Sequence, residues 1–268
     1  MTPNQNAERL LRAYDNATRL ALPSADDVAF DLARGYEVAD LLRTRRLARG
    51  ERHLGYKIGF TNRTIWPRYG VFGPIWGPIW NTTTTLLDTA QCEVALRGLV
   101  QPRLEPEIAF AFAAPPRAGM SEADLANCID WVAHSFEVVH THFDDWRFQA
   151  ADTVADFALH GRLIVGPRVP MSRFSAPGTE LAALKVELLR DGTVIDEGRG
   201  ANVLDGPLTA LRIWVDAMLA QPHGWPIEAG HIVTTGTLTD AAPLLPGQLW
   251  TTRLSEPRLS GLRLRTLP

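Results

Sequence analysis

The sequence predicts an α+β protein with mixed β-sheets and a helical N-terminal region. Apolar residues keep a helical spacing through the first fifty residues, whereas from Gly50 onward short apolar runs are bounded by glycine and proline. Strands dominate this second part without regular βαβ alternation, and no glycine-rich phosphate loop is visible. We therefore expect a helical cap over residues 1–49 and a mixed-sheet body over residues 50–268.

Two helices are predicted in the cap. The first is indicated by apolar residues at helical spacing, namely Leu10, Leu11, Tyr14, Thr18 and Ala21. The second opens at Ser24-Ala25-Asp26-Asp27, which is close to a capping box, and continues through Val28, Leu32, Val38 and Leu42.

The first half of the body is predicted to be mostly strands. Strand-like runs cover residues 53–60, 82–97 and 108–113. Ser121 is expected to cap a helix that carries Leu125, Ile129 and Val132 on one face and leads into the apolar run 136–140.

The second half combines a hairpin, a helix and further strands. Asp191-Gly192 suits the positive φ values of a tight turn between the two alternating segments of residues 185–198. Pro207 is expected at the first position of a helix of about four turns, and three strand-like runs follow, at 231–238, 248–254 and 261–267.

Composition excludes several classes of protein. The 268 residues are 46% hydrophobic and carry a net charge of -3, which leaves no basic surplus for nucleic acid. No apolar run reaches the ~18 residues that cross a bilayer, and the polar N-terminus does not resemble a signal peptide, so we expect no membrane partner and a cytoplasmic location. Cys92 and Cys128 lack metal-ligand spacing and receive no role.

Three glutamates are the strongest chemical signal. Glu105 and Glu107 flank Pro106 and project to the same face of an extended chain, because side chains alternate along a strand. Taken alone, such a pair is more often a solvated strand end. Glu137, however, lies inside an apolar strand, where an unpaired carboxylate is costly. Three carboxylates are hard oxygen ligands, so the sequence predicts a site for Mg²⁺ or Mn²⁺.

Lys57 interrupts an apolar strand, and two interpretations remain open. In the first, the stem of the side chain is buried and its ammonium group reaches water. In the second, the ammonium group serves a metal site as a fixed positive charge or as an acid–base group with a lowered pKa.

Asp152 and Asp156 are four residues apart and share one face if their segment is helical. For His140, His142 and His160, which lack paired metal-ligand spacing, a structural role is favoured.

Five ordered motifs together resemble one known family. They are GYKIGFT, LEPEIAFAF, FEVVHTHFDDWRFQAADTVAD, EGRGANVLDGP and VTTGTLT, and the similarity covers roughly residues 8 to 265. In this order they resemble the 2-keto-4-pentenoate hydratase family, which includes the 4-oxalocrotonate decarboxylases and belongs to the fumarylacetoacetate hydrolase superfamily. The resemblance implies a mixed β-roll with a helical N-terminal cap, and a cytoplasmic homo-oligomer.

The resemblance also implies roles for individual residues. Glu105, Glu107 and Glu137 would bind the metal, and Lys57 would line the active site. Asp152 and Asp156 would belong to the segment that supports the site, and we include both among the candidate catalytic residues. The substrate carboxylate would contact a wall formed by Thr235, Gly236 and Thr237.

This chain departs from the family pattern at two pocket segments. Pro74-Ile75-Trp76-Gly77 replaces the family's Pro-Asp-Phe-Gly, so a candidate proton-handling acid is missing. Residues 156–160 contribute Phe157 and His160 where the family has polar groups. We expect Ile75, Trp76 and Phe157 to contact the substrate and His160 to substitute for the acid. Trp76 and Trp80 would form an apolar lid or pack into a core or a subunit interface.

The predicted function is a metal-dependent hydratase. It would convert 2-hydroxy-2,4-dienoates into 4-hydroxy-2-oxo acids through a metal-bound enolate. Decarboxylation, keto–enol tautomerisation or C–C hydrolysis of a related 2-oxo acid are alternatives, as is a non-catalytic metabolite-binding homologue. Because the altered segments are apolar, we expect monocarboxylic substrates to be preferred over dicarboxylic ones unless Arg68 or His160 reaches the second carboxylate.

Overall fold

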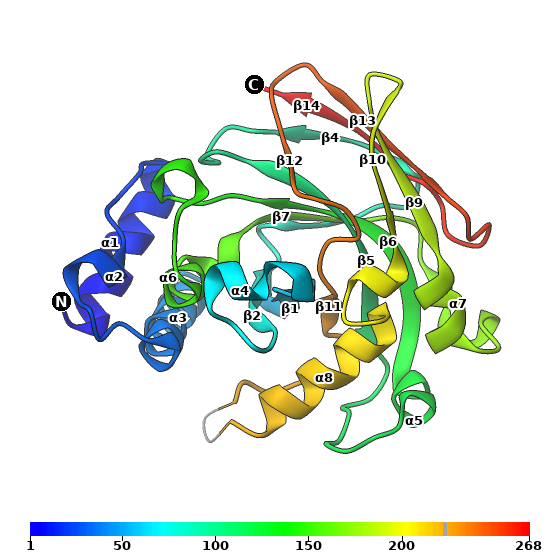
Figure 1. Cartoon of the computed structure of the whole chain (residues 1–268), viewed down its shortest axis with the longest axis horizontal. Helices are drawn as coiled ribbons and strands as arrows, with labels where there is room; N and C mark the ends of the chain where they lie inside the picture. Colours follow the sequence, from blue (N-terminus) through cyan, green and yellow to red (C-terminus); the bar gives the residue numbers. More distant parts are fainter. Residues whose placement is uncertain (222–223) are drawn as a thin grey trace.

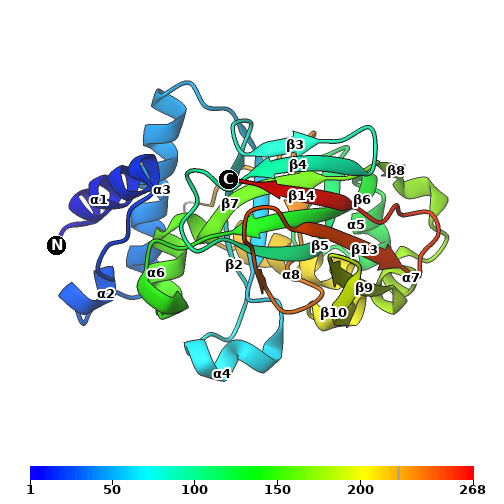
Figure 2. The ribbon, with the colours of Figure 1, turned by 90° about the horizontal axis from the view of Figure 1, so that it is seen from above.

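Helices occupy the N-terminal part of the chain. The computed structural model describes residues 1–221 and 224–268, apart from the side chains of Ile65, Arg68 and Tyr69. Helices α1, α2 and α3 pack beside the sheets at one end of the molecule (Figure 2). Their bounds are Pro3–Asn16, Pro23–Asp26 and Leu32–Ala48.

The predicted second helix is in fact two helices. α2 ends at Asp26, and α3 begins after Asp31, whose side chain accepts a hydrogen bond from the backbone of Arg34. Val28 lies between them and is fully exposed. The first helix also ends earlier than expected, because Ala17 adopts the left-handed conformation that terminates α1.

The remaining helices are mostly short connections between strands. The α-helices are α4 (Trp66–Tyr69), α5 (Glu122–Ala126), α6 (Ala150–Ala155), α7 (Pro177–Ala183) and α8 (Pro207–Leu219). The 3₁₀ helices are η1 (Arg63–Ile65), η2 (Asp144–Trp146), η3 (Phe157–Leu159), η4 (Met171–Arg173) and η5 (Gly200–Asn202). α8 begins at Pro207, as predicted, and its 13 residues are close to the expected four turns.

The described strands form two mixed sheets (Figure 1). The nine-stranded sheet has the order β2-β1-β11-β5-β6-β7-β3, with β12 added to β5 and β8 to β6; the five-stranded sheet has the order β10-β9-β13-β14-β4. The larger sheet contains β1 (His53–Gly59), β2 (Ile75–Trp80), β3 (Thr84–Leu86), β5 (Arg103–Phe112), β6 (Ile129–Val139), β7 (His160–Val165), β8 (Val169–Pro170), β11 (Ile232–Thr234) and β12 (Ala242–Pro243). The smaller contains β4 (Gln91–Ala95), β9 (Lys185–Arg190), β10 (Thr193–Arg199), β13 (Leu249–Leu254) and β14 (Arg263–Leu267).

One prediction for the strand regions is correct and another is wrong, and the difference is between local turn chemistry and long-range strand pairing. The hairpin β9–β10 is confirmed, and Asp191 and Gly192 both have positive φ at its turn. The prediction that a helix carries Ile129 and Val132 is wrong, because α5 ends at Ala126 and both residues lie in β6. Pairing of β6 with β5 along ten residue pairs outweighs the local helical spacing.

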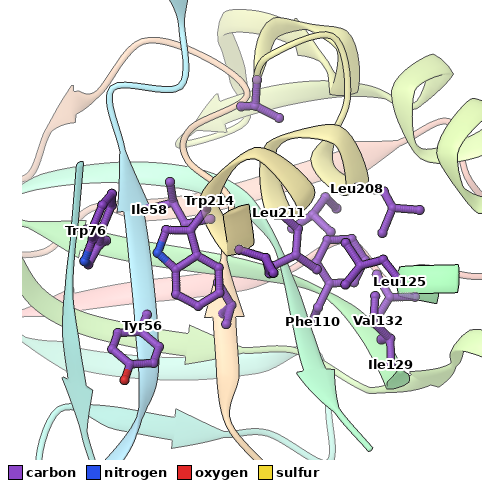
Figure 3. Packing of buried hydrophobic residues seen from close by; sticks show 14 of the residues in the cluster. Tyr56, Ile58, Trp76, Phe110, Leu125, Ile129, Val132, Leu208, Leu211 and Trp214 are labelled. Carbon is purple, nitrogen blue, oxygen red and sulfur yellow. The ribbon is translucent and has the colours of Figure 1, made fainter. Parts of the chain in front are cut away.

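Two large apolar cores support the sheets. One lies between α8 and the nine-stranded sheet, where Leu208, Leu211 and Trp214 face Phe110 and Tyr56 (Figure 3). The other joins the two sheets through residues such as Phe136 of β6 and Trp250 of β13. Phe110 and Phe136 lie on the same face of the β5–β6 pair, and the opposite face, which carries the glutamates, packs through a smaller core that includes Ala109 and Ala133. Across the described ranges, no helix is long and apolar enough to cross a membrane.

Candidate active site

The three predicted glutamates meet on neighbouring strands. Glu105 of β5 lies directly opposite Glu137 of β6, and Glu107 follows on the same face of β5. One carboxylate oxygen from each lies within 4.8 Å of the others. The strand register thus brings together groups that are thirty residues apart in the sequence.

Pro106 fits in this central strand because the neighbouring ladder is interrupted beside it. β11 pairs with residues 109–111 of β5, and β12 pairs with residues 103 and 104 of the same strand. Residues 105–108 of β5 therefore have no partner among the described strands on this side. The Pro106 carbonyl faces this gap and accepts a hydrogen bond from Leu238 at 2.9 Å. The missing N–H of the proline would point to the same side, where no strand requires it.

The chemistry of this cluster fits a divalent cation. Glu107 and Glu137 are buried, and Glu107 Oε1 has no hydrogen-bond partner among the described residues. Burial raises the pKa of Glu107 well above its usual value, and the adjacent Glu137 and Glu105 raise it further. A buried, unpaired carboxylate oxygen is costly unless a cation neutralises it, and carboxylates are the ligands that Mg²⁺ and Mn²⁺ prefer.

Lys57 lies beside the carboxylates. Its Nζ is 3.2 Å from Glu137 Oε2, without hydrogen-bond geometry, and its side chain is buried. Burial by itself lowers the pKa of Lys57, but attraction to Glu137, Glu105 and Glu107 outweighs it and the pKa is raised. Among the alternatives for Lys57, this direction favours a fixed positive charge over an acid–base group of lowered pKa.

His160 contacts Oε1 of Glu137, the carboxylate oxygen that does not face Lys57. Its Nδ1 lies 2.8 Å from Glu137 Oε1, and its Nε2 lies 2.8 Å from Thr83 Oγ1. Burial lowers the pKa of His160 despite the adjacent carboxylate, so the ring is neutral near pH 7. Nδ1–H then donates to Glu137, and Nε2 accepts from the Thr83 hydroxyl.

Gly236 orients Glu107. Its backbone N–H donates to Glu107 Oε2 at 2.9 Å. The residue has a φ of +95°, and a Cβ there would lie 2.0 Å from Thr61 Oγ1. Only glycine therefore allows the backbone to approach both Glu107 and Thr61 this closely.

A cavity of about 310 Å³ opens beside this cluster. Five of the predicted site residues line it, namely Lys57, Ile75, Glu105, Gly236 and Thr237. Glu107 and Glu137 are buried and are not among its described lining residues, but each has a carboxylate oxygen within 4.8 Å of one on Glu105, which does line the cavity. Ala158 and Leu159 add apolar surface. The cavity therefore joins a charged wall to an apolar one, as a small anionic ligand with a hydrocarbon chain requires.

Trp76 does not line the described cavity, contrary to the prediction. Alternation along β2 points Ile75 into the cavity and Trp76 into the core, where its ring centroid is 5.0 Å from that of Tyr36. Trp80 is also buried. Of the alternatives for the two tryptophans, core packing is what the structure shows.

Phe157, Thr235 and His160 also lie off the cavity surface. Phe157 packs against Tyr14 of α1 at 4.8 Å between ring centroids, in the core beneath the N-terminal helices. The Thr235 hydroxyl donates to the Ile108 carbonyl. His160 is enclosed by Glu137 and Thr83, so its contacts make it a positioning residue and leave it without direct access to a substrate.

The two aspartates serve buried hydrogen-bond networks away from the cavity. Asp152 accepts hydrogen bonds from the Ser24 backbone and hydroxyl, at 2.9 and 2.7 Å, and so ties α2 to α6. Asp156 accepts from His142 Nδ1 at 2.5 Å and from the Thr141 hydroxyl. Burial opposes ionisation of Asp156, but His142 outweighs it and lowers the pKa. Through these contacts, both aspartates stabilise the segment that contains η3.

Sequence reasoning missed two charged residues of the cavity, Arg103 and Asp240. Arg103 precedes Glu105 by two residues, so the alternation that paired the glutamates also places Arg103 on their face. Asp240 follows the Thr235–Thr237 segment and carries no comparable signal. Trp146 and Phe148 add aromatic surface from the loop after β6. The side chain of Arg68 lies outside the described part of the chain.

Comparison with known proteins identifies the class and then the family. No family model matches the chain. The solved 4-oxalocrotonate decarboxylase from Pseudomonas putida G7, complexed with magnesium and adipate, is 27% identical with a TM-score of 0.90 and covers 99% of this chain and 97% of its own. The chain therefore has the fold of the fumarylacetoacetate hydrolase superfamily.

Two curated relatives narrow this class. The 2-hydroxyhexa-2,4-dienoate hydratase of Comamonas testosteroni is 30% identical over 240 residues, covering 89% of this chain and 87% of the relative. A 4-oxalocrotonate decarboxylase of a Pseudomonas species is 29% identical over 241 residues, covering 90% of each. The chain belongs to the 2-keto-4-pentenoate hydratase and 4-oxalocrotonate decarboxylase family.

Proposed function

We propose that the chain is a divalent-metal-dependent hydro-lyase that adds water to 2-hydroxy-2,4-dienoates and releases 4-hydroxy-2-oxo acids. The observation that carries the proposal is the meeting of Glu105, Glu107 and Glu137 beside Lys57 at the wall of a cavity. The names of the hydratase relatives supply the substrate class. Magnesium, which the related decarboxylase structure contains, or manganese would be held by the three glutamates.

The bound metal, Lys57, His160 and Gly236 would each have a separate role in the reaction. Bound Mg²⁺ would supply a Lewis acid that polarises the 2-oxygen of the substrate. The Lys57 ammonium would hold the negative charge that develops on that oxygen, because it is desolvated and fixed in place. His160 and the Gly236 N–H would keep Glu137 and Glu107 oriented.

Water addition also needs a group that exchanges a proton near the far end of the substrate. Ile75 stands where the family has an acid and has no ionisable group. Asp240 is, besides Glu105, the carboxylate among the described residues that line the cavity. We assign this step to Asp240: its carboxylate would take a proton from the water as the water oxygen bonds to C4, and that proton would pass to C3 as the 2-oxo group forms again.

Decarboxylation is the second candidate, because the relatives include decarboxylases and because the cavity contains the cation Arg103. Tautomerisation and C–C hydrolysis would use the same groups and differ in which atom is protonated or which group is expelled. A metabolite-binding homologue without activity would still bind Mg²⁺ together with a 2-oxo acid, so binding alone does not separate it from an enzyme.

The test is an assay of 2-hydroxypenta-2,4-dienoate with Mg²⁺, following loss of dienol absorbance and identifying products by mass spectrometry. We expect a 4-hydroxy-2-oxo acid. Release of CO₂ from 4-oxalocrotonate, with no hydration, would favour the decarboxylase. Absence of any turnover, despite thermal stabilisation by Mg²⁺ that deepens with oxalate, would favour the non-catalytic homologue.

Glu107→Gln provides the matched control for this assay. The change is nearly isosteric but removes a ligand charge, so we expect calorimetry to detect no Mg²⁺ binding while the circular dichroism spectrum stays unchanged. Glu93→Gln alters an exposed glutamate of β4 and should bind Mg²⁺ as the wild type does. Unchanged Mg²⁺ affinity in Glu107→Gln would remove the basis of the metal site.

The architecture and the assembly of the chain are the subject of two further proposals. We propose that residues 1–49 form a helical cap on a β-roll body of residues 50–268, which the packing of α3 on α6 supports. A homo-oligomeric state and a cytoplasmic location stay predictions from the resemblance.

A further inference from the structure

Arg46 of α3 joins the N-terminal helices to the segment that precedes β1. It is almost fully buried, and its Nε and Nη2 donate to the two carboxylate oxygens of Glu51 at 3.0 and 2.7 Å. Burial opposes ionisation of Glu51, but the hydrogen bonds from Arg46 and from the Thr82 hydroxyl outweigh it and lower the pKa of Glu51. The carboxylate is therefore ionised, and the two parallel hydrogen bonds fix both side chains in one geometry.

The turn before β3 connects Glu51 to His160. The Thr82 hydroxyl donates to Glu51 Oε2, and the backbone N–H of the next residue, Thr83, donates to the Trp80 carbonyl at 3.0 Å. Thr83 is buried, and its hydroxyl lies 2.8 Å from His160 Nε2 and 3.2 Å from the Trp80 carbonyl. Two adjacent threonines of one turn therefore bind Glu51 on one side and the histidine on the other.

Aromatic contacts bring the segment before His160 to the same arginine. The Cζ of Arg46 lies 4.7 Å from the ring centroid of Trp80 and 5.7 Å from that of Phe157. Phe157 begins η3, which leads directly into His160, and the three residues of η3 all have positive φ. Because side chains other than glycine disfavour this conformation, the surrounding contacts must hold it. Arg46 thus packs on the segment that leads to His160 and, through Glu51, binds the turn opposite it.

We propose that Arg46 is a positioning residue for the metal site. It holds the turn at Thr83 against η3 and so fixes the His160 ring, which orients Glu137 through their contact at 2.8 Å. The inference rests on the proposed function, because it takes Glu137 as a metal ligand. The N-terminal helices thereby contribute to metal binding, since α3 supplies the arginine. Direct partners of metal ligands change metal affinity by about 10- to 100-fold, and a residue that acts through such a partner should have a smaller effect.

The contact between Thr83 and His160 is tested by a pair of substitutions in the full chain. Thr83→Val keeps the branched shape but removes the hydroxyl, so calorimetry should find Mg²⁺ binding weakened by about tenfold. Thr83→Ser keeps the hydroxyl and should stay within about threefold of the wild type. Thr266→Val is the control, because it removes a buried hydroxyl that binds the carbonyls of Leu245 and Gln248. It should lower stability and leave Mg²⁺ affinity unchanged.

The part of Arg46 is tested by a double-mutant cycle on Mg²⁺ affinity. Arg46→Met should weaken Mg²⁺ binding by about three- to tenfold. Combined with Thr83→Val, the loss should be smaller than the product of the two single losses, because both changes act on the same histidine ring. Thr82→Val removes the contact with Glu51 at an exposed residue, where folding is not at risk, and should weaken Mg²⁺ binding by about threefold.

Arg258→Met is the matched control for Arg46→Met. Arg258 also pairs with carboxylates, those of Glu180 and Glu256, and its Cζ also lies over an aromatic ring, 3.9 Å from the centroid of Phe174. Its replacement should lower stability without changing Mg²⁺ affinity. Mg²⁺ affinities within about twofold of the wild type in both Arg46→Met and Thr82→Val, or losses that multiply independently in the double variant, would overturn the proposal.

A measurement on the metal-free protein separates this inference from the proposed function. The Nδ1 proton of His160, observed by NMR in protein with ¹⁵N-labelled histidine and assigned by its loss in His160→Asn, should exchange slowly with water in the wild type. Exchange should be at least about tenfold faster in Arg46→Met and in Thr83→Val. Faster exchange and weaker Mg²⁺ binding in a protein that hydrates no dienol would support the inference and count against hydration alone. Failure of the proposed function thus shows in the wild type, and failure of this inference shows in the variants.

Discussion

His160 donates its Nδ1–H to Glu137 Oε1 at 2.8 Å while accepting from the Thr83 hydroxyl at 2.8 Å. Glu137 is thereby held between His160 and Lys57, which lies 3.2 Å from its other oxygen. Partners of this kind orient metal ligands and fix the histidine tautomer. From the sequence we expected His160 to substitute for a missing acid. In the structure, His160 instead orients Glu137, a candidate metal ligand.

The role of His160 can be tested with a pair of substitutions. His160→Leu removes the donor to Glu137 and should weaken Mg²⁺ binding by about 10- to 100-fold. In His160→Asn the side-chain amide can occupy the place of Nδ1, so Mg²⁺ affinity should stay within about threefold of the wild type. Calorimetry measures both, and similar losses in the two variants would contradict the assignment.

Lys57→Met should lower turnover by more than about 100-fold, because it removes the positive charge beside the developing oxyanion. Mg²⁺ affinity should not weaken, since the lysine repels a cation at the three glutamates. Lys185→Met is the natural control, because Lys185 is the chain's other lysine and is exposed at the start of β9. Activity of Lys57→Met within a few-fold of the wild type would leave Lys57 with a structural role only.

Asp240→Asn separates the two halves of the proposed reaction. Water addition should slow by about 100-fold because the proton-transfer group is lost, while loss of the dienol by ketonisation continues. The ratio of hydrated to ketonised product, measured by mass spectrometry, reports this directly. Asp88→Asn, at a strongly exposed aspartate, should leave the ratio unchanged. An unaltered ratio in Asp240→Asn would assign the proton transfer to another group.

His134 should make the folded state sensitive to acid. Burial lowers its pKa to about 4, while Nδ1 contacts the Glu107 carbonyl and Nε2 contacts the Thr252 hydroxyl, both at 2.9 Å. The unfolded chain takes up this proton near pH 6.5 and the folded chain only near pH 4. Stability from the neutral ring is therefore fully present above pH 6.5 and is lost as the pH falls to 4, by up to about 3 kcal/mol.

Urea unfolding of the metal-free protein between pH 7 and pH 4 checks this effect. His134→Gln lacks the titrating ring, so the free-energy difference between wild type and variant should shrink as the pH falls. A difference that stays constant over this range would show that His134 does not contribute to the acid sensitivity.

The sequence by itself determined the identity and local direction of several site residues. Alternation along an extended chain placed Glu105 and Glu107 on one face, and the apolar surroundings of Glu137 required a compensating charge. The same rule, applied two residues earlier, would have included Arg103. Turn chemistry at Asp191-Gly192 likewise specified a hairpin from neighbouring residues alone.

Only the tertiary structure decided which face of each strand meets the cavity and which partners lie across it. Ile75 and Trp76 are adjacent, and the packing of β2 against Tyr36 selects which one contacts the cavity. The same holds for Glu137, whose partners Lys57 and His160 come from β1 and β7, and for Asp152, which binds Ser24 from 128 positions away. Such contacts depend on strand register and helix docking, which are set by the burial of many side chains together and leave no periodic signal near the residues concerned.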